Sequence, residues 1–335
     1  MLLLQSKKNI LSVGEYVDGI INFDRTIFAR AITLIESTNP KHIKVAQVVL
    51  KKIFHKTGNS IRIGITGAPG AGKSTFIEAL GVKLCTEGHK LAILAVDPSS
   101  IRSRGSVLGD KTRMERLSLF DNVFIRPSPS GGTLGGVARR TRETILLCEA
   151  AGFDIIFVET VGVGQSEITV RGMVDFYLLL LMPGGGDELQ GIKKGSVEIA
   201  DAIIINKADG DNVILANLTR DAYKQAIHYL MPATDGWETP IMTVSSKEGK
   251  GIDEVWRKVI DFIEHTKTTG VFYKRRQNQQ LEWFYNQLFE SLKEIFFFNS
   301  EIKKLLPKLE KKVVEGKITP ELAVNKAINL FLQKK

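Results

Sequence analysis

The sequence is poor in the residues and patterns that membrane, secreted and metal-storing proteins use. Among 335 residues there are 2 Cys and 5 His, and they form no cluster. Cys85 and Cys148 lie far apart inside periodic apolar segments, so we expect two buried, reduced thiols. No apolar run is long enough to cross a membrane. Because the opening MLLLQSKKNI turns polar too early for a signal peptide, we expect a cytoplasmic protein without a membrane role.

The excess of positive charge does not by itself indicate a nucleic-acid partner. The formal net charge is +9, and residues 267–335 contribute most of it, with 14 Lys or Arg against 7 Glu. In that region basic residues alternate with apolar ones, as in EIKKLLPKLEKKVV. The alternation favours the solvated face of a helix over a surface for nucleic acid or for an acidic partner. We therefore predict no nucleic-acid binding.

The spacing of apolar residues divides the chain into three predicted regions. Residues 1–58 are expected to form a helical extension, with helical periodicity from about Gly19 to Thr57 and a turn at STNPKH. Residues 59–266 are expected to form a doubly wound, mostly parallel α/β sheet, because short apolar runs alternate with helical or loop-like segments. These runs are IRIGIT, LAILAV, NVFIRP, DIIFVET, DFYLLLLM, AIIINK and PIMTVS. Residues 267–335 are predicted to form a helical arm that breaks at LLPK and KITPE.

A glycine-rich stretch, GITGAPGAGKST, predicts a phosphate-binding loop. Gly67, Gly72, Lys73 and Ser74 fit the pattern G-x-x-x-x-G-K-[ST], with an apolar strand before it and a helix after it. The backbone amides of such a loop cradle phosphates, its lysine reaches the β- and γ-phosphates, and its serine binds Mg²⁺. The expected nucleotide contacts here are Gly67, Ala68, Pro69, Gly70, Ala71, Gly72, Lys73, Ser74 and Thr75.

A second motif, IIINKADG, predicts that the base is guanine. Asn206, Lys207 and Asp209 form Asn-Lys-x-Asp at the end of a predicted strand. The Asp209 carboxylate can accept hydrogen bonds from guanine N1–H and from the exocyclic amine, and adenine offers neither donor. We expect Lys207 to pack along the base and Asn206 to tie the loop together. The stretch TVSSKEG follows the next strand, and its Ser245, Ser246 and Lys247 are expected to form a second base-contacting loop.

Three acidic residues are candidates for serving a metal ion and its waters. Asp97 and Glu159 follow or end predicted parallel strands beside the phosphate loop, where oxygen ligands suit Mg²⁺. Asp97 precedes Pro-Ser and fits a helix cap as an alternative. Asp110 lies in the glycine-flanked stretch VLGDKTRMERL, which fits a switch that orders around the γ-phosphate. We expect Lys73, Asp110 and Glu159 to carry the catalysis.

The hydrolytic machinery predicts slow intrinsic turnover. Ras-like GTPases place a water-orienting Gln directly after the glycine of Asp-x-x-Gly. Here Val163 follows Gly162, and Gln165 comes two residues later. We therefore expect slow hydrolysis of GTP that accelerates only when a partner orders the switch segments.

The motifs GAPGAGKST, DPSS, GDKTRM, ETVGVGQSE, PGGGDELQGIKKG and NKAD, in this order, resemble those of the MeaB/ArgK-type GTPases. The likeness covers nearly the whole chain, and it implies a P-loop NTPase of the SIMIBI class in which Glu159 replaces the usual Walker B Asp. It implies GTP/GDP and Mg²⁺ as cofactors and a homodimer formed through the C-terminal arm. It also implies chaperone action on an adenosylcobalamin-dependent acyl-CoA mutase, chiefly methylmalonyl-CoA mutase, by gating cofactor loading and by protecting or reactivating the enzyme.

The resemblance also assigns roles to particular residues. By their match to the family motifs, Lys73 and Ser74 look like phosphate and Mg²⁺ ligands, and Asp97, Asp110 and Glu159 look like groups serving the metal. The segment 183–194 resembles an additional switch that transmits the nucleotide state to the mutase. Its polar candidates are Asp187, Glu188, Gln190 and Lys193.

Other functions and other uses of the arm remain alternatives at this point. A nickel-type metallochaperone GTPase should carry a His-rich tract or paired Cys, and a protein-targeting GTPase should carry a Met-rich helical domain; neither is present. A small-molecule kinase or ATPase, as the ArgK name suggests, needs an acceptor pocket with a base, and no pattern indicates one. The apolar stripe from Leu281 to Phe296 fits packing on the chain's own core or on a two-fold partner. Isobutyryl- and ethylmalonyl-type mutases stay open as clients.

Overall fold

The computed structural model describes residues 10–96, 114–126, 134–160, 166–184 and 194–333. The chain divides between Gln279 and Gln280 into two compact units, which are described in turn. Among these residues no helix is both long and apolar enough to cross a membrane.

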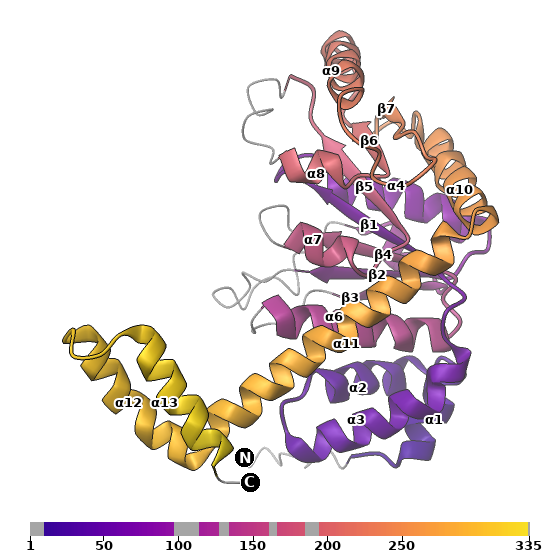
Figure 1. Ribbon diagram of the computed structural model, residues 1–335. Coiled ribbons are helices and arrows are strands. Elements are labelled where there is room, and N and C mark those ends of the chain that lie inside the picture. Colours follow the sequence, from indigo (N-terminus) through magenta and orange to yellow (C-terminus); the bar gives the residue numbers. More distant parts are fainter. Residues whose placement is uncertain (1–9, 97–113, 127–133, 161–165, 185–193, 334–335) are drawn as a thin grey trace, which may run out of the picture. The chain divides into compact units, whose positions relative to one another are not determined.

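Seven strands form one sheet in the first unit, and each neighbouring pair is parallel. Their spatial order is β3-β2-β4-β1-β5-β6-β7, so β1 lies in the middle and later strands are added on both of its sides (Figure 1). The seven predicted strands are confirmed. They are β1 (Ile61–Gly67), β2 (Leu91–Val96), β3 (Val123–Arg126), β4 (Ile155–Thr160), β5 (Phe176–Leu181), β6 (Ala202–Ile205) and β7 (Ile241–Thr243).

Helices cover both faces of this sheet, because alternate residues of each strand point to opposite sides. In β4, Phe157 packs in the cluster that includes α4 (Lys73–Thr86) and α10 (Ile252–Thr268). Val158 packs in the cluster that includes α6 (Leu134–Ala150) and α7 (Ser166–Arg171). The doubly wound α/β fold is therefore confirmed. Helices α8 (Lys194–Glu198) and α9 (Asn212–Ile227) also follow β1 in this unit. Short 3-10 turns lie before β1 at Phe54–Lys56 and before β3 at Leu117–Leu119.

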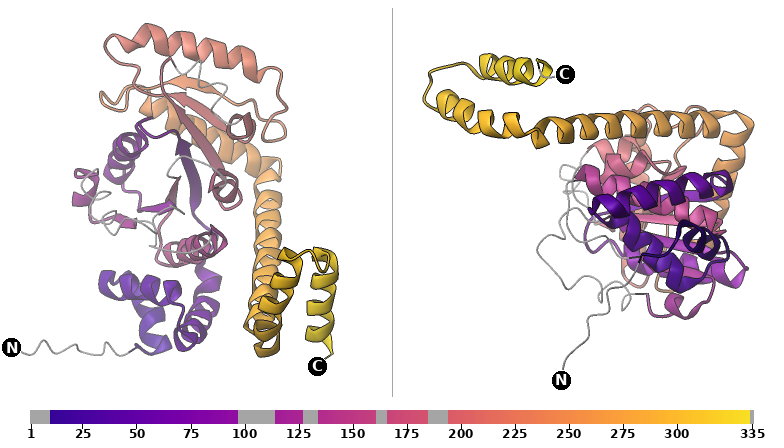
Figure 2. Two further views of the ribbon diagram at one scale, coloured as in Figure 1. Left: turned by 90° about the vertical axis from the view of Figure 1, so that its left-hand side faces the viewer. Right: turned by 90° about the horizontal axis from the view of Figure 1, so that it is seen from below.

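Three helices precede the sheet and pack against α6, as Figure 2 shows in indigo. They are α1 (Val13–Ile21), α2 (Arg25–Glu36) and α3 (Pro40–Ile53). The turn between α2 and α3 falls at STNPKH, as predicted, but α1 begins before the predicted helical region. Its start is fixed by a capping box, in which Ser12 and Glu15 bond to each other's backbone N–H groups. The S-x-x-E pattern at these two positions is the signal that could have located it.

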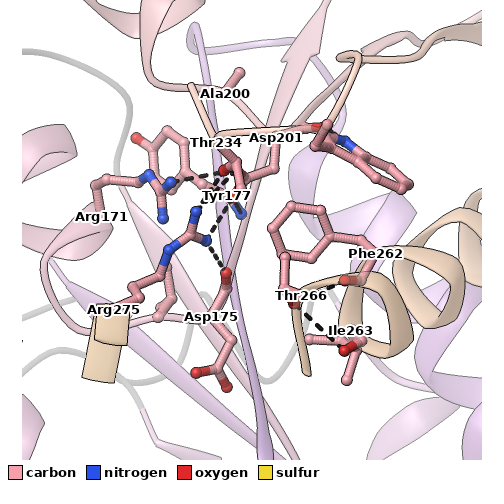
Figure 3. A network of polar contacts seen from close by, with 12 residues as sticks. Arg171, Asp175, Tyr177, Ala200, Asp201, Thr234, Phe262, Ile263, Thr266 and Arg275 are labelled. Atoms are coloured by element: carbon pink, nitrogen blue, oxygen red, sulfur yellow. Dashed lines mark hydrogen bonds and ion pairs between the residues drawn. The ribbon is translucent and has the colours of Figure 1, made fainter. Parts of the chain in front are cut away.

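A buried ion network closes the amino-terminal edge of the sheet. Asp201, directly before β6, has a fully buried carboxylate that accepts from Thr234 Oγ1 at 2.5 Å and from Arg171 Nη2 at 3.2 Å. Arg275 also bonds to Thr234, to the Asp201 carboxylate at 3.3 Å and to the carbonyl oxygen of Asp175 (Figure 3). The network thus joins the turns that lead into β5 and β6 to the helix that carries Arg275.

Asp175 and Glu149 extend the same network toward β1. The Arg276 guanidinium donates two hydrogen bonds of 2.7 Å to the Asp175 carboxylate. It also donates to the carbonyl oxygens of Gly58 and Ser60. Arg62, near the start of β1, donates from Nε to Glu149 at 2.9 Å. The carboxylates of Asp175 and Glu149 are fully buried, and each is paired with a guanidinium, which is the arrangement a buried charge requires.

The helix with Arg275 and Arg276 is α11 (Val271–Phe298), and its first residues belong to the first unit. Phe272 and Gln279 are buried there, and Gln279 Nε2 donates to the carbonyl oxygen of Val174 at 2.8 Å. The sequence placed the start of the arm at residue 267, whereas the division by compactness falls a dozen residues later.

The second unit holds the rest of α11 together with α12 (Ser300–Val314) and α13 (Pro320–Leu332). The predicted break at KITPE is confirmed, since Thr319 caps α13 and Pro320 follows at its first position. The predicted break at LLPK is wrong, because Pro307 lies inside α12. The chain turns instead at Asn299, whose side chain caps α12. Pro307 removes one backbone donor, but the helix continues because its apolar face packs against α13 through Leu309.

Candidate nucleotide-binding site

The predicted nucleotide residues that the structure describes lie at the carboxyl edge of the sheet, opposite the ion network. β1 ends at Gly67, residues 68–72 form a loop, and α4 begins at Lys73. β1 has β4 on one side and β5 on the other, and the order of the strands reverses around it. In open α/β sheets ligands bind in the crevice at such a point, outside the carboxyl ends of the strands.

The loop keeps its shape through glycines that no other residue could replace. Gly67 has φ +152° and a Cβ there would lie 2.3 Å from the carbonyl oxygen of Leu180. Gly72, the cap of α4, has φ +87° and a Cβ there would lie 2.5 Å from Asn206 Nδ2. Both positions combine the left-handed backbone region with a close neighbour, so the sequence pattern reflects space as well as flexibility. The loop therefore presents its backbone N–H groups at the amino end of α4, where an anion is favoured.

Lys73 lies along the loop that precedes it. It is buried, at 8% exposed, and its Nζ donates to the carbonyl oxygens of Gly67 at 2.7 Å and Ala68 at 3.2 Å. The ammonium group is thus held at the phosphate loop by the backbone. Ser74, the second residue of α4, is half-buried beside it, and Thr75 is exposed.

Asn206 connects the phosphate loop to the second base-contacting loop, as the sequence predicted for a tying residue. Its Nδ2 donates to the carbonyl oxygen of Ala71 at 2.9 Å, and its Oδ1 accepts from Ser246 N at 3.2 Å and Ser246 Oγ at 2.6 Å. Asn206 is 1% exposed, so these bonds are shielded from water. The three motifs therefore meet at one amide side chain.

Asp209 and its neighbours form the part of the site that the sequence predicts to contact the base. The Asp209 carboxylate is half-buried and accepts from Ser245 Oγ at 2.6 Å, and Ser245 Oγ in turn accepts from Glu248 N at 3.1 Å. Lys207 is exposed and has φ +60°, a left-handed conformation that is uncommon outside glycine. Lys247 is exposed on the loop after β7. Because Ser245 fixes one carboxylate oxygen, the orientation of Asp209 is set before any ligand arrives.

Glu159 is the one predicted acidic residue of the metal site within the described residues. It stands near the end of β4, level with Ile65 of β1 and Ala95 of β2, and it is half-buried. The other predicted residues of the metal and switch segments lie outside the described residues. They are Asp97, Asp110, Gly162, Val163, Gln165, Asp187, Glu188, Gln190 and Lys193. Among the residues that are described, no group of three or more His, Cys, Asp or Glu could hold a metal ion.

Two buried hydroxyls beside these motifs were not singled out from the sequence. Thr66 immediately precedes Gly67, Thr160 immediately follows Glu159, and their Oγ1 atoms lie 2.8 Å apart. Both are fully buried near the carboxyl ends of strands whose other buried residues are apolar. A polar residue that closes an aliphatic strand next to a motif is the signal that could have found them.

Comparisons with known proteins agree with this geometry. The family model described as "Methylmalonyl Co-A mutase-associated GTPase MeaB" matches residues 28–301. A Caulobacter vibrioides protein named "Putative GTPase" is 50% identical over 96% of this chain and 98% of its own length. The mouse "Methylmalonic aciduria type A homolog, mitochondrial" is 43% identical over 97% of this chain and 81% of its own length.

A solved structure, described as "Crystal structure of LAO/AO transport system kinase", has the same fold along nearly the whole chain. It is 37% identical, with a TM-score of 0.75, and covers 98% of this chain and 100% of its own. The family match and the relatives named as GTPases show that this chain binds a guanine nucleotide. The chain belongs to the MeaB family of P-loop GTPases, enzymes that bind and hydrolyse GTP.

Proposed function

We propose that this GTPase is a chaperone of an adenosylcobalamin-dependent acyl-CoA mutase, with methylmalonyl-CoA mutase as its first client. The observation that carries the proposal is the match of the mutase-associated family model over residues 28–301. The relative named after methylmalonic aciduria adds support, because it aligns with 97% of this chain. In this proposal GTP hydrolysis gates cofactor loading and protects or reactivates the mutase.

In the proposed cycle the phosphate loop binds the phosphates of GTP, and the base-reading loops bind guanine. The amides of residues 67–75 hold the phosphates, and Lys73 shifts from its carbonyl partners to the β- and γ-phosphate oxygens. Asp209 accepts from guanine, with Lys207, Ser246 and Lys247 around the base. Asn206 keeps both halves together through its bonds to Ala71 and Ser246. Binding energy is thereby gained at both ends of the nucleotide.

Mg²⁺ suits the chemistry of the oxygen donors that the sequence assigns to this site. The Ser74 hydroxyl and the carboxylates of Glu159, Asp97 and Asp110 are hard oxygen ligands, which Mg²⁺ prefers in proteins. We assign them to the ion and to its waters. When bound, the ion neutralises the charge that develops on the phosphates. Glu159 is half-buried at the end of β4, so its carboxylate is held by the sheet rather than by a loop.

Hydrolysis that depends on the client follows from the same proposal. We assign the polar residues of the extra switch, Asp187, Glu188, Gln190 and Lys193, to the transmission of the nucleotide state. Slow turnover without a client keeps GTP bound until the mutase arrives, which is the property a gate requires.

The second unit supports a homodimer as part of the proposal. Helices α11, α12 and α13 line a groove of about 820 Å³ with mainly apolar side chains, and many of these are exposed. In the sequence 281–298 of α11, apolar residues recur on one stripe and several are more than half exposed. An exposed apolar surface of this kind typically marks a protein interface, and a second copy offers the same surface under two-fold symmetry.

GTP turnover with and without purified candidate apo-mutases tests the chaperone proposal. A client should accelerate hydrolysis at least about tenfold, and Lys73→Ala should abolish the stimulated rate, which rules out a contaminating activity. A failure of each mutase to stimulate turnover would contradict the proposal. Transfer of the γ-phosphate to a small molecule instead of water would favour the kinase alternative.

Sedimentation velocity tests the dimer. Val324→Asp combined with Ile328→Asp places two charges on exposed positions of the groove and should yield monomers. Val213→Asp, on an exposed position of α9, serves as the matched control and should leave the dimer intact. A wild-type chain that sediments as a monomer at micromolar concentration would contradict this part of the proposal.

A further inference from the structure

Three buried hydroxyls lie on one face of the three strands that meet at the phosphate loop. Thr160 ends β4, Thr66 lies near the end of β1, and Tyr177 is in β5; these strands are neighbours in the order β4-β1-β5. All three side chains are fully buried. Thr66 and Thr160 share a hydrogen bond of 2.8 Å between their Oγ1 atoms. The hydroxyl of Tyr177 makes no hydrogen bond of ordinary geometry within the described residues.

Packing alone does not explain this choice of residues. Valine has the shape of threonine and would fill the same space without a polar atom, and most of the other buried residues of β1 and β4 are apolar. A buried hydroxyl costs free energy unless it is hydrogen-bonded, and the bond between Thr66 and Thr160 meets this requirement for the pair. The Tyr177 ring is also tightly seated, since a Cβ on Gly64 of β1 would lie 2.7 Å from its Cδ2 atom. Burial raises the pKa of Tyr177, so its hydroxyl stays protonated.

The position of the pair gives it a use in hydrolysis. Thr66 is joined to Gly67, the first residue of the phosphate loop, and Thr160 is joined to Glu159, the described acid of the proposed metal site. The hydrogen bond between them therefore ties the two chain segments that must hold the γ-phosphate and the acid at a fixed separation. Small displacements of such groups lower the rate of a reaction strongly. The nucleotide itself is held elsewhere, by the loop amides and by the Asn206 junction.

We propose that Thr66 and Thr160 are positioning residues for GTP hydrolysis, and that they act by fixing Glu159 relative to the phosphate loop. Tyr177 of β5 is level with Gly64, two residues before Thr66, and covers the same face of β1. This proposal rests on the role assigned to Glu159, and it requires no client protein. It predicts a defect in the chemical step rather than in nucleotide binding.

The test is a double-mutant cycle on the full-length chain with Thr66→Val and Thr160→Val. Each single variant should lower kcat about tenfold while KM for GTP and the Kd for GDP change less than about twofold. Because either change removes the same bond, the double variant should be no slower than the singles. Thr160→Ser, which keeps the hydroxyl, should restore most of the rate. Thr266→Val, at a buried threonine of α10 whose hydroxyl donates to the carbonyl oxygens of Phe262 and Ile263, is the matched control and should leave kcat unchanged.

Several outcomes separate the proposal from a structural role and from failure of the Glu159 assignment. Multiplicative losses in the double variant, or an equal loss of kcat and GDP affinity, would overturn the positioning role. A normal kcat in a folded Thr160→Val variant would overturn it as well. If Glu159→Gln abolishes hydrolysis while Thr160→Val does not, only the positioning role fails. If Glu159→Gln hydrolyses GTP normally, the role assigned to Glu159 is wrong. The positioning role of Thr66 and Thr160 is then also wrong, because it depends on Glu159.

Discussion

The two edges of the central sheet carry different kinds of polar groups, although the same strands run between them. At the amino edge, three fully buried carboxylates, Glu149, Asp175 and Asp201, are each paired with arginines. At the carboxyl edge, the described groups are glycines, amides and hydroxyls, with one buried lysine, two exposed lysines and the half-buried acids Glu159 and Asp209. β5 and β6 show the contrast directly, because each begins after a buried aspartate of the network and ends beside a nucleotide motif.

The difference follows from whether the polar groups of an edge stay paired permanently or must bind and release a ligand. A buried ion pair is strongly held once formed, since removing one partner leaves an unpaired charge in a medium of low dielectric. A ligand site cannot be built in this way, because its polar groups must be satisfied both with and without the ligand. Backbone amides, neutral side chains and a lysine that bonds to carbonyl oxygens meet that need. We infer that the amino edge determines stability and the carboxyl edge determines binding.

Truncation before α11 should have the largest effect on stability, because it removes Arg275 and Arg276 from the ion network at the amino edge. A chain that ends at Gly270 lacks Phe272, Arg275, Arg276 and Gln279, and we expect it not to fold. A chain that ends at Leu281 keeps these residues, and we expect it to fold and to bind GDP. Circular dichroism and GDP titration distinguish the two. If the chain that ends at Gly270 unfolds cooperatively, the amino-edge network is not required for folding and this prediction is wrong.

A single charge removed from the network should destabilise the protein without changing nucleotide binding. Arg276→Met leaves the Asp175 carboxylate buried and unpaired, which should lower the free energy of unfolding by about 3–5 kcal/mol. Urea unfolding measures the change, and the KM for GTP of the folded fraction should stay the same. Lys258→Met breaks an exposed ion pair with Asp261 and serves as the control, with a loss below about 1 kcal/mol. Equal losses in both variants would contradict the importance of the network.

The two edges also differ in how far the sequence predicts them. The carboxyl edge was predicted because its motifs are local: the spacing of glycines in residues 64–75 and the tetrad at 206–209 fix their own geometry. Alternation of apolar runs likewise predicted the seven strands. The amino edge was not predicted, because Arg276 and Asp175 are about a hundred residues apart and only the fold brings them together. The helix break predicted at Pro307 is wrong for a related reason, because tertiary packing outweighs the local preference against proline in a helix.

At the carboxyl edge, Asp209→Asn should produce the largest change in binding while leaving stability intact. The amide can no longer accept both hydrogen bonds from guanine, so the Kd for GDP should rise at least about a hundredfold. Xanthine carries a carbonyl oxygen where guanine carries the amine, and an amide can donate to it. Xanthosine diphosphate should therefore bind the variant more tightly than GDP does. Isothermal titration calorimetry measures both, and an unchanged preference for GDP would contradict the assignment of Asp209.

The smallest predicted effect gives the sharpest comparison of the two edges. Ser245→Ala removes the hydroxyl that donates to Asp209 at 2.6 Å, so the carboxylate is no longer held in place before guanine binds. One such bond is worth about 1 kcal/mol, which corresponds to a rise of about fivefold in the Kd for GDP. Ser118→Ala, on an exposed serine, is the control and should leave the Kd unchanged. If Ser245→Ala instead lowered the free energy of unfolding by as much as the Arg276 variant, binding and stability would not be divided between the two edges.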